Sequence, residues 1–257
     1  MASETIDELF SRTLLEDYDA DAPWHAVHDL QSIGNREVFE RSVQWCVSQD
    51  AIKRARGADV LAQLGKTADH PTNNFPDESF AVISDLIRRE TEVQPLSSAI
   101  HALGHIGNPQ TVPLIVTFSM HPDPDVRFAL ACALGNFSDD PVAVDALVEL
   151  TRDVDDDVRD WSTFGLGALG KMDTPEIREA LVDRLGDSFE DVRQEAIVGL
   201  ARLKDRRVIP ALVLSLEQPA VADIIVEAAS EMLELQNAVE GWEAEDYAVA
   251  LRNKFKL

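Results

Sequence analysis

Apolar residues recur along this chain at the spacing of one helical face, and the same arrangement returns seven times. The seven units are counted from Ala22, Arg56, Pro95, Val126, Val158, Val192 and Ile224. They begin 34, 39, 31, 32, 34 and 32 residues apart. A nearly constant period in this range is typical of a stacked repeat array, in which each repeat buries its apolar face against its neighbours.

Within each unit, the fifth, ninth and twelfth residues form an apolar stripe with helical spacing. The ninth residues are Leu30, Leu64, Leu103, Leu134, Leu166, Leu200 and Met232. The twelfth residues, from Ile33 to Leu235, are apolar in every unit except the one that has Thr67. Small residues near the stripe, such as Ala99 and Ala196, would let neighbouring helices approach closely. The stripe therefore predicts the second helix of a helical hairpin in every unit.

A first helix is predicted before most of these second helices. The expected first helices span residues 36–47, 80–89, 111–120, 142–151, 176–185 and 207–216. The segment Asp173-Thr174-Pro175-Glu176 combines N-cap residues with a proline in the first turn. Gly34, Gly107 and Gly170 each follow a twelfth residue, where a left-handed C-cap favours glycine. No segment alternates with a period of two, so we expect no strands.

The expected organisation is an N-terminal capping helix, a repeat array and a C-terminal capping helix. The boundaries are 1–21, 22–239 and 240–257. Hairpins that cannot bury their apolar faces alone would stack into one elongated core.

Three units open with aspartate, valine and arginine in succession. The triplets are Asp125-Val126-Arg127, Asp157-Val158-Arg159 and Asp191-Val192-Arg193. With the Leu-Gly that closes several units, they resemble HEAT repeats of the short bacterial type, which phycobilin lyases also contain. The resemblance covers roughly residues 22–236 and implies an all-α fold, a right-handed α-α superhelix of about six to seven hairpins. It also implies an Asp–Arg ladder that ties adjacent repeats together.

A more specific resemblance is confined to the second half of the chain. Residues 158–164, 191–200 and 223–229 are similar to a bacterial HEAT-repeat family. Some members of that family are encoded beside Rhs-type toxin genes and are thought to act as immunity proteins. This resemblance implies one alternative function, the neutralisation of a cationic toxin.

The composition is strongly acidic, with 47 Asp and Glu against 23 Lys and Arg and a net charge of −24. Such a surface repels nucleic acid and anionic membranes, and it favours a basic protein partner. Adaptation to habitat or a gain in solubility is an equally good explanation. Cys46 and Cys132 lie in separate units and form no disulfide framework. The N-terminus lacks the features of a signal peptide, and no apolar run is long enough to span a bilayer. We therefore expect a cytoplasmic protein.

The sequence contains no motif of a catalytic site. His101 and His105 lie four residues apart and could share a metal, but no third strong ligand has suitable spacing. We interpret them as part of a solvated helical face, and we expect no catalytic residue, metal or cofactor. The segment 70–76 lengthens one interval and is interpreted as a tolerated loop insertion.

By the HEAT resemblance, second helices line the concave face of the array. Residues that point away from the apolar stripe would be exposed there. They predict an aromatic patch of Phe128, Trp161 and Phe164, rimmed by Asp160, Glu195, Glu227 and Glu231. Aromatic anchors inside a charged rim are typical of protein interfaces. The alternative is that Trp161 or Phe164 packs into the seam between repeats.

The function that these features favour is a non-catalytic protein-binding scaffold or adaptor, monomeric, which holds a basic partner on its concave face. The immunity protein is one alternative. Another is a bilin lyase or isomerase-like enzyme, in which His101, Cys132 and Trp161 would line a cavity. The sequence specifies neither the partner nor the organism.

Overall fold

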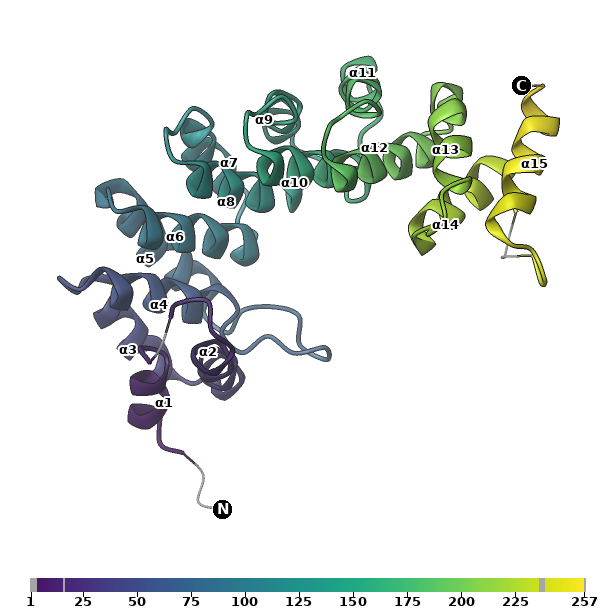
Figure 1. Cartoon of the computed structure of the whole chain (residues 1–257). Coiled ribbons are helices and arrows are strands. Elements are labelled where there is room, and N and C mark those ends of the chain that lie inside the picture. Colours follow the sequence, from purple (N-terminus) through teal and green to yellow (C-terminus); the bar gives the residue numbers. More distant parts are fainter. Residues whose placement is uncertain (1–3, 16, 236–238, 257) are drawn as a thin grey trace. The chain divides into compact units, whose positions relative to one another are not determined.

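The computed structural model describes residues 4–15, 17–235 and 239–256, and in these residues every regular element is a helix (Figure 1). The predicted absence of strands holds for this part of the chain. The helices form two compact units, Met1–Phe137 and Ser138–Leu257, and each is described by itself.

The first unit is built around three second helices. Its elements are α1 (Ile6–Arg12), α2 (Asp21–Ile33), α3 (Arg36–Cys46), α4 (Ala51–Ala62), α5 (Pro76–Arg89), α6 (Val93–Ile106), α7 (Thr111–Ile115), η1 (Val116–Phe118) and α8 (Pro124–Gly135). Helix α6 packs between α4 and α8, while α3 and α5 cover α4 and α6. Helix α2 packs on α1 and α4. The N-terminal helices thus belong to the same core as the repeats that follow.

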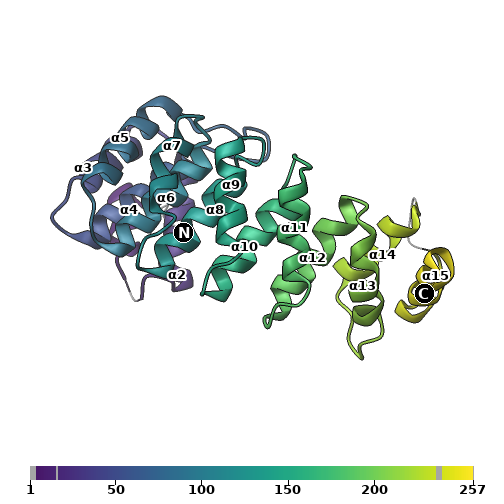
Figure 2. The ribbon, with the colours of Figure 1, turned by 90° about the horizontal axis from the view of Figure 1, so that it is seen from above.

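The second unit has two layers of helices. Its elements are α9 (Pro141–Leu150), α10 (Asp156–Gly167), α11 (Pro175–Arg184), α12 (Glu190–Arg202), η2 (Arg206–Val208), α13 (Ile209–Leu216), α14 (Asp223–Leu233) and α15 (Ala244–Phe255). Helices α10, α12 and α14 follow one another in contact along the unit (Figure 2). Helices α9, α11 and α13 form the other layer (Figure 1). Helix α15 packs on α13 and α14. The roles of α1 and α15 as caps stay predictions.

The predicted stripe is confirmed at two of its three positions. Every ninth residue is buried, and so is the fifth residue of each unit, from Ala26 to Ala228. The prediction that the twelfth residues are buried is mostly wrong: Ile33 is 41% exposed and Leu169 is 40% exposed. Most second helices end before their twelfth residue, so helical spacing no longer determines which way that side chain points.

The predicted start of the unit counted from Arg56 is also wrong, because it lies three residues too late in the chain. Arg54 makes the same contacts as Arg127, which is the second residue of its own unit. The unit therefore starts at Lys53, and α4 begins before the predicted start. Three residues are nearly one helical turn, so Leu61 and Leu64 fit the pattern equally well, and both are buried.

Helix ends follow the expected chemistry with one exception. The Thr174 hydroxyl accepts a hydrogen bond from the Ile177 amide at 3.3 Å, which caps α11. Gly34 and Gly107 adopt the left-handed conformation, with φ of 56° and 73°. Gly170 does not, so its prediction as a C-cap is wrong. A Cβ there would lie only 1.9 Å from the Leu166 carbonyl oxygen, so this glycine permits a close backbone contact instead.

A repeated arginine fixes the turn before each of several second helices. One Nη atom donates to the carbonyl oxygens five and six residues earlier in the chain. The four arginines are Arg54, Arg127, Arg159 and Arg193. Because turn carbonyls lack helical partners, these bonds satisfy groups that would otherwise remain unpaired.

Two of these arginines also reach the next repeat, as the resemblance implied. Arg159 forms a two-pronged ion pair with Asp187, and Arg54 does the same with Glu90. These acids precede the next second helix by several residues. They are not the aspartates beside valine, since Asp157 and Asp191 are exposed in the first turns of α10 and α12. Negative charge at that position favours the helix dipole.

Small residues bring successive second helices together, as predicted. A Cβ on Gly104 would lie 2.7 Å from the Ala133 Cα, and one on Gly199 would lie 2.7 Å from the Gly167 Cα. The first pair joins α6 to α8, and the second joins α10 to α12. The close contact lets consecutive helices expose a continuous row of side chains on their free side.

Candidate functional site

The first unit contains a cavity of about 450 Å³ among α2, α4, α6 and α8. Aromatic, imidazole and carboxylate side chains line it. They include Tyr18, Asp19, Trp24, His28, Asp59, Ser97, His101, His105, Asp125 and Phe128. Among the described residues that line the cavity, none is lysine or arginine. The volume lies in the range of small-molecule sites.

A buried polar network forms one side of this cavity. The Asp59 carboxylate accepts hydrogen bonds from the Tyr18 hydroxyl and, at 3.3 Å, from the Arg56 guanidinium. The Tyr18 hydroxyl also lies 2.8 Å from the Ser98 hydroxyl. Arg56 donates to the Thr13 carbonyl at 3.0 Å, and its guanidinium lies 3.7 Å from the centre of the Tyr18 ring. The network links the N-terminal segment to α4 and α6.

Burial dominates the electrostatics of this network. It raises the pKa of the Asp59 carboxyl, while the hydrogen bond from Tyr18 and the charge of Arg56 oppose that change. Burial and the nearby Asp59 also raise the pKa of the Tyr18 hydroxyl well above its usual range. Tyr18 therefore stays protonated and acts as a hydrogen-bond donor to Asp59.

The interpretation of His101 as a solvated residue is wrong. Burial, with a further contribution from His105, lowers the pKa of His101 to about 4. Its ring centre lies 6.1 Å from that of Phe128, at an interplanar angle of 68°. The imidazole is therefore neutral at neutral pH and forms part of an aromatic wall. The interpretation holds for His105, which is exposed one turn further along α6, whereas His101 is half-buried beside Phe128 of α8.

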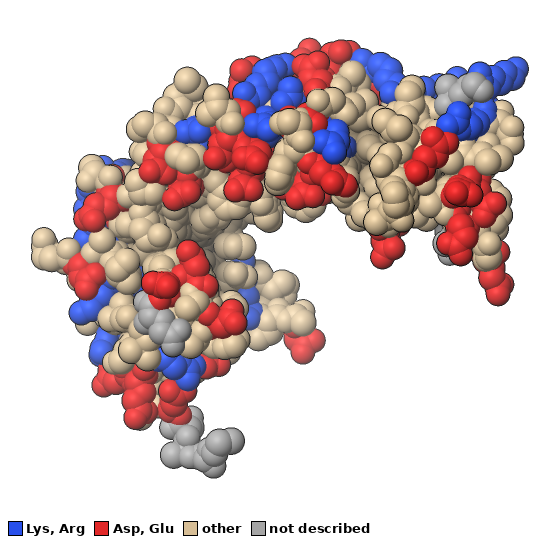
Figure 3. All heavy atoms as spheres, viewed as in Figure 1, with Lys and Arg blue, Asp and Glu red and all other residues tan. Residues whose placement is uncertain are grey.

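In the second unit, Trp161 and Phe164 form an aromatic pair on α10. Their ring centres are 5.5 Å apart in an edge-to-face arrangement. Trp161 is 40% exposed and Phe164 is half-buried. The alternative that both pack into the seam between repeats is therefore wrong for Trp161. Acidic side chains gather over α10 and α12 in this unit (Figure 3).

Two of the predicted rim carboxyls lie close to each other beside this pair. Burial and the charges of Asp191 and Asp157 raise the pKa of Asp160 to about 6. Burial and the charges of Asp160 and Asp191 raise the pKa of Glu195 to about 7. Asp160 Oδ1 is buried and accepts no hydrogen bond from any residue that the structure describes. We call Asp160, Trp161, Phe164 and Glu195 the α10–α12 face.

The other predicted contact residues lie elsewhere. Glu227 and Glu231 are exposed on α14, and Glu231 forms an ion pair with Lys204 at 2.7 Å. Phe128 belongs to the first unit, where it lines the cavity. That these seven residues bind a partner stays a prediction.

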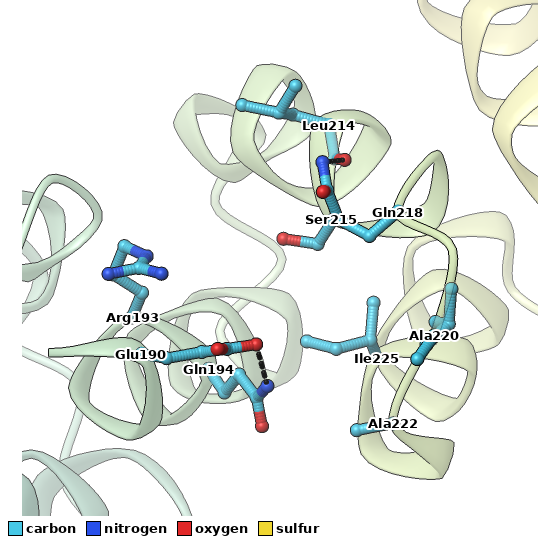
Figure 4. Close-up of a pocket in the computed structure, with 10 residues that line it drawn as sticks. Glu190, Arg193, Gln194, Leu214, Ser215, Gln218, Ala220, Ala222 and Ile225 are labelled. Carbon is cyan, nitrogen blue, oxygen red and sulfur yellow. Dashed lines mark hydrogen bonds between the residues drawn. The ribbon is translucent and has the colours of Figure 1, made fainter.

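A smaller cavity of about 260 Å³ lies among α12, α13 and α14 (Figure 4). Its polar groups are largely bonded to the protein itself. Gln194 donates to Glu190 at 3.2 Å, Gln218 donates to the Leu214 carbonyl at 3.0 Å, and Arg193 bonds to its preceding turn. These groups leave few polar atoms free to bind a ligand, so we regard this cavity as a weaker candidate.

Sequence reasoning missed Tyr18, Trp24, Arg56 and Asp59 as site residues. One signal could have revealed them: Arg56 and Asp59 are ionisable residues in a run of small and apolar residues, from Ala55 to Ala62. Charges that are almost fully buried are normally paired, so such a run indicates an internal polar network.

The described residues contain no helix with the length and apolarity needed to cross a membrane. Nor do they contain three or more His, Cys, Asp or Glu side chains grouped so that they could hold a metal ion.

The helical hairpins, their period and the tight contacts between second helices define an α-helical repeat protein. A family model for HEAT repeats matches residues 81–167 and 166–234, which is more than half of the chain. The chain belongs to the HEAT-repeat family, and the predicted fold class is confirmed.

Two groups of relatives are informative. Protein YibA of Escherichia coli K12 is 28% identical over 232 residues, which is 88% of this chain and 80% of YibA. An X-ray structure of YibA matches with a TM-score of 0.70 and 26% identity, covering 97% of this chain and 92% of that one. The phycocyanobilin lyase subunit alpha of Thermosynechococcus vestitus is 29% identical over 177 residues, which is 68% of this chain and 63% of that protein. The complex of CpcE and CpcF of phycocyanin lyase from Nostoc shares the fold, with a TM-score of 0.51 and 13% identity over 99% of this chain and 96% of that one.

Proposed function

We propose that this chain is a protein-binding scaffold without catalytic activity, which holds a basic segment of a partner protein against its second helices. The observation that carries the proposal is the α10–α12 face. There an exposed tryptophan lies beside two carboxyls, Asp160 and Glu195, whose pKa values are raised to about 6 and about 7.

Burial raises both pKa values most, and the neighbouring carboxylates raise them further. Neither carboxyl forms an ion pair with any residue that the structure describes. A lysine or arginine of a partner would relieve the repulsion between them, and Trp161 could stack on a guanidinium. Partly buried aromatic residues with charged neighbours are the usual energetic centres of protein interfaces. The arrangement therefore favours a basic partner over an acidic one.

The Nostoc structure supports protein binding by this fold, because its CpcE and CpcF form a complex with each other. Cys46 is a buried free thiol, which is compatible with a reducing compartment such as the cytoplasm. A monomeric scaffold that acts there is the simplest form of the proposal.

A lyase-like activity is the second candidate, favoured by the phycocyanobilin lyase relatives. His101 lines the first-unit cavity as that alternative requires, whereas Cys132 is not among its lining residues and Trp161 belongs to the other unit. A bilin carries two propionates, and the cavity offers no lysine or arginine to pair with them. We therefore rank the scaffold first. An absorbance shift on mixing the purified protein with phycocyanobilin would reverse that order.

The scaffold is tested by capture of partners with Trp161→Glu as the altered bait. Trp161 is exposed, so the substitution should leave the fold intact while it adds a negative charge to the face. We expect a basic protein that the native bait captures from host lysate at low salt to be reduced at least about tenfold, since a central aromatic anchor contributes 1.4 kcal/mol or more.

Val154→Glu is the matched control, because Val154 is 93% exposed in the turn before α10 and lies outside the α10–α12 face. It should capture the partner as the native bait does. Equal capture by all three baits would remove the α10–α12 face as the binding site. Capture of an acidic protein alone would contradict the proposed charge of the partner.

A further inference from the structure

The first-unit cavity has walls whose chemistry specifies the charge of its ligand. Three of its lining residues are aspartates, namely Asp19, Asp59 and Asp125, and three are aromatic, namely Tyr18, Trp24 and Phe128. Asp19 and Asp125 are exposed and lie at the mouth, whereas Asp59 is buried. We propose that this cavity binds an organic cation, a guanidinium or ammonium group on an alkyl chain.

The aromatic rings that line the cavity form pairs whose planes meet at steep angles. The Tyr18 and Trp24 ring centres are 6.0 Å apart at an interplanar angle of 89°, and His28 lies 6.4 Å from Trp24. On α6 and α8, His101 and Phe128 form a second edge-to-face pair. Aromatic faces that meet at such angles attract organic cations through the negative potential above each ring.

Two positive groups lie near the cavity without lining it, Arg56 and Lys66. The Lys66 ammonium donates to the carbonyl oxygen of His105. The Arg56 guanidinium covers one face of two wall rings, 3.7 Å from the Tyr18 ring centre and 4.9 Å from the Trp24 ring centre.

Arg56 is almost completely buried and is absent from the lining residues. Its guanidinium lies 3.3 Å from Asp59 and bonds to the carbonyl oxygens of Thr13 and Tyr18. His101 is held neutral by burial. An anion would therefore meet carboxylates with no counter-charge in the wall, whereas a cation meets acceptors and rings.

The volume of the cavity and its polar lining residues suit a cationic head group on an alkyl chain. A volume of about 450 Å³ exceeds that of a single guanidinium and leaves room for an alkyl chain. Gln63 and Gln94 also line the cavity, and their side-chain amide oxygens are acceptors for the N–H groups of such a head group.

The test is a calorimetric titration of the purified full chain with a charged ligand and its neutral isostere. N-acetyl-arginine amide and N-acetyl-citrulline amide differ by the charge of the head group and little else in shape. We expect saturable binding of the arginine compound and at least about tenfold weaker binding of the citrulline compound. Equal affinities for the two, or no heat from the arginine compound at millimolar concentration, would overturn the proposal.

Two variants assign the binding to the cavity. Asp19→Asn removes a charge at the mouth and should weaken binding about threefold, and Trp24→Leu removes a ring and should weaken it about tenfold. Asp17→Asn is the matched control: Asp17 is an exposed aspartate two residues from Asp19 that does not line the cavity. Circular dichroism and the melting temperature show whether Trp24→Leu remains folded. Binding by Asp19→Asn that matches Asp17→Asn, together with unchanged binding by a folded Trp24→Leu, would place the cation elsewhere and refute the assignment.

The same titration separates two sources of the cation. Agmatine represents a free small molecule, and a neutral hexapeptide with one central arginine represents a side chain of a partner protein. Comparable affinities identify a small-molecule site, and at least tenfold tighter binding of the peptide identifies a side-chain site. Absence of binding in both arms overturns the proposal. The titration needs no partner protein, so its failure leaves the α10–α12 face and its capture experiment untouched.

Discussion

The two units use the same helical hairpin, yet they place their acidic groups in opposite environments. In the first unit, Asp59 is buried and bonded to Tyr18 and Arg56. In the second unit, Asp160 and Glu195 lie beside an exposed tryptophan and repel each other. The second helices pack in the same way in both units. The different environments of the acidic groups therefore come from the residues on the free side of these helices. A repeat array can therefore vary its binding surfaces without changing its core.

The largest expected effect on either unit comes from removing the arginine of the first-unit network. Arg56→Met keeps most of the side-chain volume but leaves Asp59 without its buried partner. We expect the free energy of unfolding to fall by about 3 kcal/mol, because an uncompensated buried carboxylate is strongly destabilising. Urea denaturation followed by circular dichroism measures the change.

Arg88→Met is the control for the loss of an arginine. Arg88 pairs with Asp85 at 2.9 Å, and both side chains are exposed. Exposed pairs contribute little, so we expect a change below about 0.5 kcal/mol. Similar effects of the two substitutions would mean that the network around Asp59 adds nothing beyond an ordinary surface pair.

The second-unit packing can be tested through the close contact between α10 and α12. Gly199→Ala introduces a Cβ 2.7 Å from the Gly167 Cα, where backbone and not a flexible side chain must yield. We expect a loss of about 2 kcal/mol in the free energy of unfolding, as is usual for an overpacked contact.

Gly186→Ala is the matched control, because a Cβ at that position meets no atom within 4 Å. It should leave stability nearly unchanged. A Gly199→Ala protein as stable as Gly186→Ala would show that α10 and α12 can separate without cost, and that the α10–α12 face is not a rigid surface.

The smallest expected effect concerns the carboxyls of the second unit. The folded-state pKa of Glu195 is raised from 4.5 to about 7, so its ionisation destabilises the fold as the pH rises through that interval. Glu195→Gln should therefore match the native protein near pH 4 and be more stable at pH 8. We expect a gain of about 1 kcal/mol, which allows for the screening of a partly exposed group.

Stability and partner binding should respond in opposite directions to this substitution. If Glu195 serves a basic partner, Glu195→Gln weakens capture about fivefold while it stabilises the free protein. Glu190→Gln, an exposed neighbour on the same helix, is the control and should change neither property. A difference between Glu195→Gln and native stability that stays constant from pH 4 to pH 8 would contradict the raised pKa.

Much of the fold could be predicted because it depends on periodic burial. The ninth residues, from Leu30 to Met232, are all in the core, and most predicted first helices agree with the structure within a few residues. The exception is the helix predicted over 111–120, where the structure has the short α7 followed by the 3-10 helix η1. The errors lie where periodicity stops. Leu169 follows the end of α10, and the frame around Arg56 slipped by nearly one helical turn.

The candidate sites were less predictable, for two different reasons. Trp161, Phe164, Asp160 and Glu195 could be assigned to one face because they lie on consecutive second helices, at the third, fourth and seventh positions of the repeat, which point away from the buried stripe. The cavity could not, because Tyr18 lies in the loop before α2 and meets Asp59 and Ser98 across 41 and 80 residues of sequence. No local pattern specifies which distant helix a loop residue contacts.

The sequence by itself determined the repeat, the helical class, the core positions at the fifth and ninth residues of each unit and the excess of negative charge. These properties depend on composition and on short-range spacing, which the chain carries directly. Only the tertiary structure decided which charges are buried and paired, as Asp59 and Arg56 are. It also decided which like charges lie close enough to repel each other, as Asp160 and Glu195 do. Burial and pairing depend on contacts between helices, and those contacts arise only when the hairpins stack.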